Sequence, residues 1–106
     1  ILEVDEGLPE GLLQQEGGTH ADEGETSMML YIAPETVDMT KAVKDYDPRP
    51  NRPGLSRSPE GSGSYSPTGI WGDPTLASRK KGRIIVEHTV SEIVREVREL
   101  ISLELE

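Results

Sequence analysis

The residues with the clearest chemical potential lie between positions 17 and 27, where a single histidine stands among acids. His20 is followed closely by Asp22, Glu23 and Glu25. Imidazole titrates near neutral pH, so it can transfer protons during hydrolysis, and a nearby carboxylate can orient the ring or stabilise its charged form. The pattern indicates a catalytic or ligand-binding histidine. A solvated or hydrogen-bonded loop histidine fits the same spacing.

Two further features of this stretch bear on a site. Gly17 and Gly18 allow the backbone to approach a ligand closely. Glu25, at the entry of a predicted helix, can accept backbone N–H bonds while pointing back toward His20. A mononuclear metal site formed by His20 and its neighbouring acids is a weaker alternative, because one histidine with flexible carboxylates is a poor ligand set for zinc.

The first element that must position these residues is a short helix over residues 26–37. Thr26 or Ser27 can cap it, and apolar residues crowd positions 28–32 before Pro34 disfavours continuation. Residues 1–25 are acidic and rich in glycine, so they are predicted to form extended chain and turns, with a short strand at positions 1–4.

A long loop over residues 38–73 follows, rich in Pro, Gly, Ser and charged residues and without periodicity. Loops beyond about 12 to 15 residues in a compact domain are usually functional or are linkers. The linker interpretation would make the chain a disordered adaptor that ends in one helix.

A terminal helix is predicted over residues 74–103, with Asp73 as its cap and Pro74 at its first position. Gly82 costs about 1 kcal/mol relative to alanine in a helix, which is tolerable if another element approaches closely there. A frayed or kinked start of the helix is the alternative. His88 is predicted to lie on the helix surface. The apolar residues recur at helical spacing: Val86, Val90, Ile93, Val94, Val97 and Ile101.

These elements do not make a complete domain. Two helices with at most one short strand cannot bury their apolar faces within this chain, so a sheet from elsewhere in the polypeptide or from another chain is implied. The absence of Phe leaves little aromatic material for a core. The chain begins at Ile1, which indicates a processed product, a truncated form or one piece of a longer polypeptide.

Composition excludes several classes of function. The formal charge of -9, from 11 Lys and Arg against 20 Asp and Glu, opposes binding to nucleic acid. The basic cluster at residues 79–83 is either an anion-binding patch or a solvated stretch of helix. No run reaches the roughly 18 apolar residues that a membrane span needs, and Cys is absent, so we expect a soluble, cytoplasmic protein that does not bind membranes.

Two separated segments resemble the creatininase family. Residues 20–30, followed by Ala-Pro-Glu at 33–35, look like the family's HAGxxETS block and the helix after it. Residues 66–74 resemble the segment before the family's last helix, and Lys81-Gly82 resembles a pair within that helix. Together these segments cover most of residues 16–100.

The resemblance implies an α/β fold. The chain would be the carboxy-terminal part of one α/β/α sandwich with a mainly parallel sheet, most of which lies outside this chain. Within it, residues 1–25 would form the active-site segment, 26–37 the short helix, 38–73 the long loop and 74–103 the terminal helix. The complete units of this family commonly assemble as homo-oligomers, often hexamers.

The resemblance also implies a chemistry. The family's site resembles a two-metal hydrolase that uses zinc or manganese, in which His20 matches the histidine that shuttles a proton between the attacking water and the leaving nitrogen. Glu25 matches a supporting acid. The family's metal ligands come from amino-terminal segments that this chain lacks, so the expected partner is the amino-terminal part of the same enzyme, and the 106 residues alone should be inactive.

The expected reaction is hydrolysis of a C–N bond in a cyclic amide or formamide. Creatinine itself is doubtful, because this chain has Glu16 and Gly17 where creatinine-specific members place Trp and Asp. A formamide of a pyrimidine intermediate and a peptide bond both stay open. Glu16 and Trp71 are the candidate substrate-binding residues, Trp71 because its flat ring and N–H suit a small planar amide. The alternative for Trp71 is a packing role that fixes the last helix.

A different class of function is a non-catalytic assembly or interaction subunit. Such a subunit would dock through the apolar face of helix 74–103. Metal content distinguishes the hydrolase hypothesis from the assembly hypothesis. An intact enzyme complex should hold about two divalent ions per site, whereas an assembly subunit should hold none.

Overall fold

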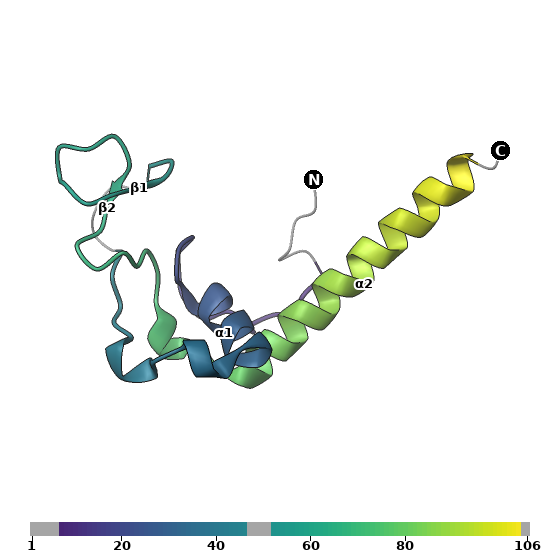
Figure 1. The fold of residues 1–106 in the computed structure, drawn as a ribbon, viewed down its shortest axis with the longest axis horizontal. Helices are drawn as coiled ribbons and strands as arrows, with labels where there is room; N and C mark the ends of the chain where they lie inside the picture. The colour runs from purple at the N-terminus through teal and green to yellow at the C-terminus, as the bar shows by residue number, and fades with distance from the viewer. Residues whose placement is uncertain (1–6, 47–51, 105–106) are drawn as a thin grey trace.

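The structure is a computed structural model that describes residues 7–46 and 52–104 (Figure 1). Its elements comprise two α-helices, three 3-10 turns and two short strands within that part of the chain. In chain order they are α1 (Glu23–Ile32), η1 (Pro34–Thr36), η2 (Met39–Lys41), β1 (Leu55–Ser56), β2 (Ser64–Tyr65), η3 (Pro74–Leu76) and α2 (Arg79–Glu104).

Helix α1 begins earlier than its sequence predicts. Asp22 is the N-cap, and its side chain accepts a hydrogen bond from the Glu25 backbone nitrogen at 2.9 Å. The prediction of Thr26 or Ser27 as the cap is therefore wrong. Aspartate is as good a cap as serine, and acidic residues in the first turn interact favourably with the helix dipole, so the helix extends back to Asp22.

The predicted terminal helix, residues 74–103, is two elements. Asp73 caps the 3-10 turn η3 with its side chain, as expected of a cap, but α2 starts only at Arg79. Ser78 provides the second cap, since its hydroxyl accepts a backbone N–H from the first turn of α2 at 3.1 Å. Serine is a favoured N-cap residue, so α2 begins directly after Ser78.

Helices α1 and α2 cross at a glycine. A Cβ atom on Gly82 would lie 1.7 Å from the carbonyl oxygen of Ser27, so the two backbones approach more closely than any other residue allows. Ser27 is fully buried there, and its hydroxyl accepts the Ser78 backbone N–H at 3.1 Å. The predicted close approach at Gly82 is confirmed.

The long segment 38–73 is structured where it is described. Strands β1 and β2 pair in parallel, with Leu55 opposite Ser64. The expectation of at most one short strand is wrong, and the strand predicted at positions 1–4 lies outside the described residues. The backbones of Asp45 and Gly72 also pair, which argues against a disordered linker.

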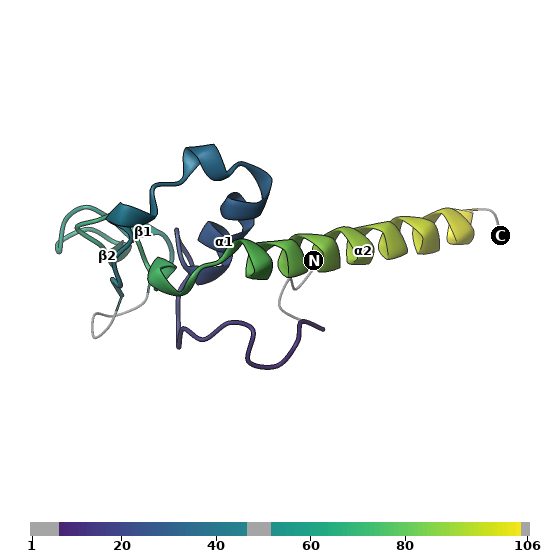
Figure 2. The same ribbon diagram turned by 90° about the horizontal axis from the view of Figure 1, so that it is seen from below.

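Helix α2 projects away from the rest of the molecule (Figures 1 and 2). The radius of gyration is 16.3 Å, against about 13 Å expected for a compact domain of this length. Among the described residues, the buried hydrophobic side chains are those of Trp71 and Ile85. The described elements are compatible with a fragment of an α/β domain.

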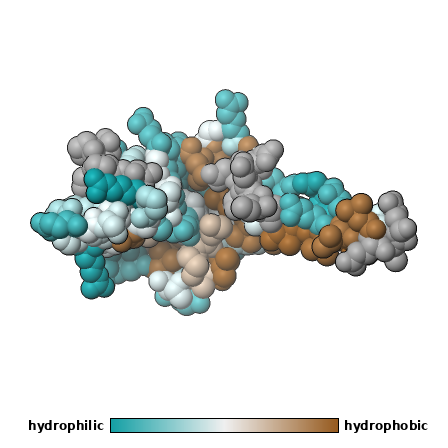
Figure 3. All heavy atoms as spheres, turned by 90° about the horizontal axis from the view of Figure 1, so that it is seen from above, coloured by the Kyte–Doolittle hydropathy of each residue, from teal (hydrophilic) through white to brown (hydrophobic). Residues whose placement is uncertain are grey.

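One side of α2 carries a row of exposed hydrophobic side chains, here called the apolar stripe (Figure 3). It consists of Val90, Ile93, Val94, Val97, Leu100 and Ile101, each between 41% and 59% exposed. Residues described in the structure leave this stripe uncovered. Among those same residues, no helix has the length and hydrophobicity to cross a lipid bilayer.

Candidate active site

The His20 segment is joined to the Trp71 segment by antiparallel backbone pairing. The Trp71 nitrogen donates to the His20 carbonyl at 2.8 Å, and the Thr19 and His20 nitrogens both reach the Trp71 carbonyl, at 2.8 and 3.2 Å. The Trp71 side chain is 2% exposed, whereas His20 is half-buried. Two segments far apart in the sequence thus meet at the candidate catalytic histidine.

The loop that carries Trp71 is fixed by Asp45. The Asp45 and Gly72 backbones exchange hydrogen bonds of 2.9 and 3.0 Å. The Asp45 carboxylate also accepts the Thr68 hydroxyl at 2.5 Å and the Ser66 hydroxyl at 3.3 Å. These contacts anchor the segment that pairs with His20.

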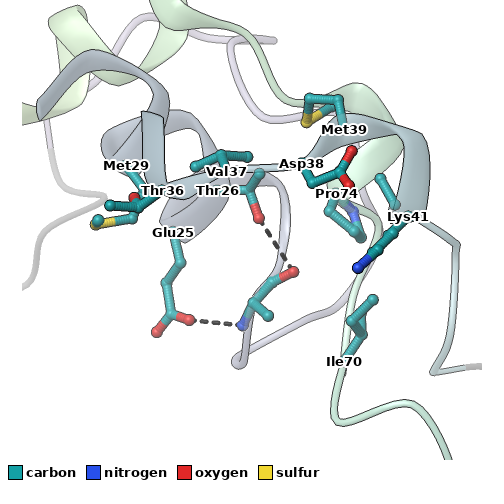
Figure 4. Close-up of a pocket in the computed structure, with 12 residues that line it drawn as sticks. Glu25, Thr26, Met29, Thr36, Val37, Asp38, Met39, Lys41, Ile70 and Pro74 are labelled. Carbon is teal, nitrogen blue, oxygen red and sulfur yellow. Dashed lines mark hydrogen bonds between the residues drawn. The ribbon is translucent and has the colours of Figure 1, made fainter. Parts of the chain in front are cut away.

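A left-handed turn follows His20. Ala21 has a φ of 47°, a region that costs a non-glycine residue about 1 kcal/mol or more. The Glu25 carboxylate accepts the Ala21 N–H at 2.6 Å, and the Thr26 hydroxyl donates to the Ala21 carbonyl at 3.2 Å (Figure 4). The prediction that Glu25 accepts a backbone N–H at the helix entry is confirmed, and this bond offsets the strain beside His20.

The other two acids near His20 serve the structure. Beyond capping α1, Asp22 accepts the Gln15 side-chain amide at 2.7 Å. Glu23 is fully buried, and its carboxylate accepts the backbone N–H groups of Gln14 and Gln15 at 2.7 and 2.9 Å and pairs with the Lys81 ammonium at 2.6 Å. One interpretation of residues 79–83 was a solvated basic stretch. Lys81 does not fit it, because its ammonium pairs with a buried carboxylate.

A metal ion held by His20 and its neighbouring acids does not fit this arrangement. The carboxylate oxygens of Asp22 and Glu23 already accept hydrogen bonds from backbone and side-chain donors. Within residues 7–46 and 52–104, no group of three or more His, Cys, Asp and Glu side chains is placed to bind a metal.

Gln15 joins three segments, and the sequence offered no signal for it. Its side-chain oxygen accepts the Glu23 N–H at 3.1 Å and the Asp73 N–H at 2.9 Å, while its nitrogen bonds Asp22. Gly72 lies beside this junction with a φ of 153°, and a Cβ there would lie 2.3 Å from the Asp22 Cβ. Gln15, through its hydrogen bonds, and Gly72, through its lack of a side chain, together bring the starts of α1 and η3 side by side.

His20 lines a hollow of about 360 Å³, here called the His20–Arg52 hollow. Its other lining residues are Thr19, Arg52, Pro53 and Gly54. Arg52 was not identified from the sequence, because it lies in a segment without periodicity and far from the histidine motif.

Glu25 lines a different pocket of about 300 Å³, here called the Glu25 pocket (Figure 4). Charged side chains at its wall are those of Glu25, Asp38 and Lys41, and most of the remainder is apolar. The lining residues are Ala21, Glu25, Thr26, Met29, Thr36, Val37, Asp38, Met39, Lys41, Ala42, Ile70 and Pro74. The predicted pair His20 and Glu25 is thus adjacent through Ala21, but the two side chains face separate pockets.

The two candidate substrate-binding residues line neither pocket. Glu16 is exposed, and its backbone nitrogen donates to the Tyr46 hydroxyl at 3.4 Å. Trp71 is covered by this chain, which favours the packing role. Substrate binding by either residue stays a prediction. His88 is half-buried on α2, beside Gly7, where a Cβ would lie 2.8 Å from the imidazole.

Comparison with known proteins places this geometry in context. The sequence model of the creatininase family, described as creatinine amidohydrolase, matches residues 3–97. A mycofactocin precursor peptide peptidase from Mycobacterium ulcerans (strain Agy99) is 36% identical over 84 residues. That similarity covers 76% of this chain and 32% of the relative, so the chain spans about a third of the relative's length. No solved structure shows a significant match.

Proposed function

The chain belongs to the creatininase family, and from this premise we propose that it is the carboxy-terminal part of an amide-bond hydrolase in which His20 transfers protons. The family match includes both segments that meet at the histidine, the one around His20 and the one around Trp71. A relative named as a peptidase supports hydrolysis of a C–N bond.

One observation carries the proposal: backbone pairing holds the half-buried His20 at the wall of an open hollow. There its imidazole is accessible to a substrate, whereas Asp22 and Glu23 are committed to structural bonds. In the proposed reaction, water adds to the amide carbonyl carbon and the C–N bond breaks. The imidazole accepts the proton of the water and delivers it to the leaving nitrogen, which yields a carboxylic acid and an amine.

Glu25 acts as a positioning residue in this scheme. Its carboxylate holds the Ala21 N–H at 2.6 Å and so fixes the strained turn that directs His20. The other side of that turn forms part of the Glu25 pocket, whose apolar wall suits the non-reacting part of a substrate.

Members of the family are generally metal-dependent. We infer that two ions, zinc or manganese, are held in the complete site by ligands from an amino-terminal part, because the described residues do not fit a metal. The same part would supply the sheet that covers the apolar stripe of α2. The 106 residues alone would then be inactive, and the complete unit would assemble as a cytoplasmic homo-oligomer such as a hexamer.

Three classes of substrate are candidates: cyclic amides, formamides and peptides. The peptidase name of the relative favours a peptide bond over the other two. The hollow at His20 is open in this chain, which is compatible with a chain-like substrate.

The test is replacement of His20 by alanine and by glutamine in the complete enzyme. Cleavage of a peptide, a formamide and a cyclic amide is followed by mass spectrometry, with bound metal measured in parallel. Loss of a general acid–base group should lower kcat by about 10²- to 10⁴-fold while the metal content stays the same. His88→Gln is the matched control and should retain activity. Unchanged kcat in His20→Ala would remove the histidine from the mechanism.

The apolar stripe of α2 favours a second candidate, a non-catalytic assembly subunit that docks through this helix. Under that alternative, a purified complex that contains this chain would bind its partner through α2 yet cleave none of the three amides and hold no stoichiometric metal. Hydrolysis that depends on His20 would exclude it.

A further inference from the structure

The His20–Arg52 hollow is basic in an acidic chain. Its ionisable lining side chains are His20 and Arg52, whereas the chain as a whole carries a formal charge of -9. The Glu25 pocket differs, because two of its three charged side chains are acidic. Of these two neighbouring pockets, the hollow is therefore the one that attracts an anion.

The backbone of Arg52 is fixed by one buried hydroxyl. Ser64, which is 1% exposed, accepts the Arg52 N–H at 2.5 Å and donates to the Arg52 carbonyl at 2.8 Å. The Ser64 nitrogen in turn donates to the Gly54 carbonyl at 2.8 Å, which ties the hollow to strand β2. These bonds hold the Arg52 backbone, from which the guanidinium side chain extends, at the hollow that His20 also lines.

Within residues 7–46 and 52–104, the guanidinium of Arg52 makes no ion pair, which leaves it able to bind a ligand. Ion pairs in the described part of the chain use Lys81, Arg83 and Arg95, and none joins Arg52 to a carboxylate there. Guanidinium presents N–H donors in a planar fork that matches the two oxygens of a carboxylate, and such charge-assisted pairs are stronger than neutral hydrogen bonds.

We propose that the hollow is a carboxylate-binding subsite, in which Arg52 holds a free carboxylate of the substrate beside His20. This inference rests on the proposed function and narrows it to amides that carry a carboxylate near the scissile bond, such as the end of a peptide. Arg52 is a specificity residue, and the imidazole of His20 remains the group that moves protons.

The experiment uses the complete enzyme and a matched pair of acetylated peptides, one with a free terminal carboxylate and one with a carboxamide. Wild type should prefer the free acid by about 10- to 100-fold in kcat/KM, the range of a charge-assisted hydrogen-bonded pair. Arg52→Gln should remove this preference through KM and leave the carboxamide peptide unchanged, while Arg52→Lys should retain part of it.

Arg57→Gln is the control, because Arg57 is an exposed arginine of the same segment that lines a different pocket. Equal loss on both peptides in Arg52→Gln, or no preference in wild type, would overturn the subsite.

A binding measurement separates this proposal from the proposed function. Calorimetry compares N-acetylglycine with N-acetylglycinamide on two proteins, His20→Ala with and without Arg52→Gln, so that loss of the proton-transferring histidine prevents turnover. If neither peptide is cleaved but N-acetylglycine binds about 10-fold more weakly to the protein with Arg52→Gln, the hydrolase assignment fails and the carboxylate subsite stands. Equal binding of both compounds to both proteins refutes the subsite, whatever the activity.

Discussion

Replacement of Gly82 by alanine tests the helix crossing that supports the candidate site. At an ordinary helix position this change stabilises a protein by up to about 1 kcal/mol, because alanine is the better helix former. Here the new Cβ would lie 1.7 Å from the Ser27 carbonyl oxygen and 2.4 Å from its carbonyl carbon. Both atoms belong to the backbone of α1, so no side-chain rotation relieves the clash.

The expected magnitude follows from these opposing effects. The separation must grow from 1.7 Å to at least 3.0 Å, below which real Cβ contacts are essentially unknown. Overpacking of this kind costs about 1–3 kcal/mol, and a rigid backbone neighbour places it at the upper end. After the gain in helix propensity, we expect a net loss of about 2 kcal/mol in the free energy of unfolding.

Gly24→Ala is the matched control, since Gly24 also lies in a helix but has room for a methyl group. The nearest atoms to its Cβ would be 3.7 and 3.9 Å away. Urea denaturation of the complete protein should show a lower midpoint for Gly82→Ala and an equal or higher midpoint for Gly24→Ala, with similar slopes. Stabilisation by both substitutions would refute the close crossing of α1 and α2.

Three further predictions concern buried charge, docking and titration. Lys81→Met leaves the fully buried Glu23 carboxylate without its partner and should cost about 3–5 kcal/mol in thermal or urea unfolding, much of which Glu23→Gln should restore. Val97→Asp places a charge in the apolar stripe, where Val97 is 49% exposed, so it should weaken co-purification with the amino-terminal part, whereas unchanged association would show that this face is not used. A hydrogen bond from Arg95 lowers the pKa of Glu92, so NMR should find its carboxylate titrating below the usual glutamate range, and Arg95→Ala should move the midpoint back up. The stabilising effect of that pair is present above the ordinary pKa of glutamate and is lost as the pH falls through the lowered value.

Local patterns in the sequence were sufficient for the helices themselves. The apolar spacing of α2 and the capping character of Asp73 depend on residues a few positions apart, and the structure confirms both, although Asp73 caps η3 and not α2. The start of α1 was misplaced, because several capping residues follow one another and sequence alone does not rank Asp22 above Thr26.

The sequence by itself determined the family, the presence of two helices and the identity of the candidate histidine, since each depends on local order along the chain. Only the tertiary structure decided that His20 pairs with Trp71, that Glu23 is buried against Lys81 and that Arg52 shares a hollow with the histidine. Each of these contacts joins residues that are distant in sequence. Their free energy comes from burial and hydrogen bonds made after the chain has folded, and no periodicity or spacing encodes such a meeting.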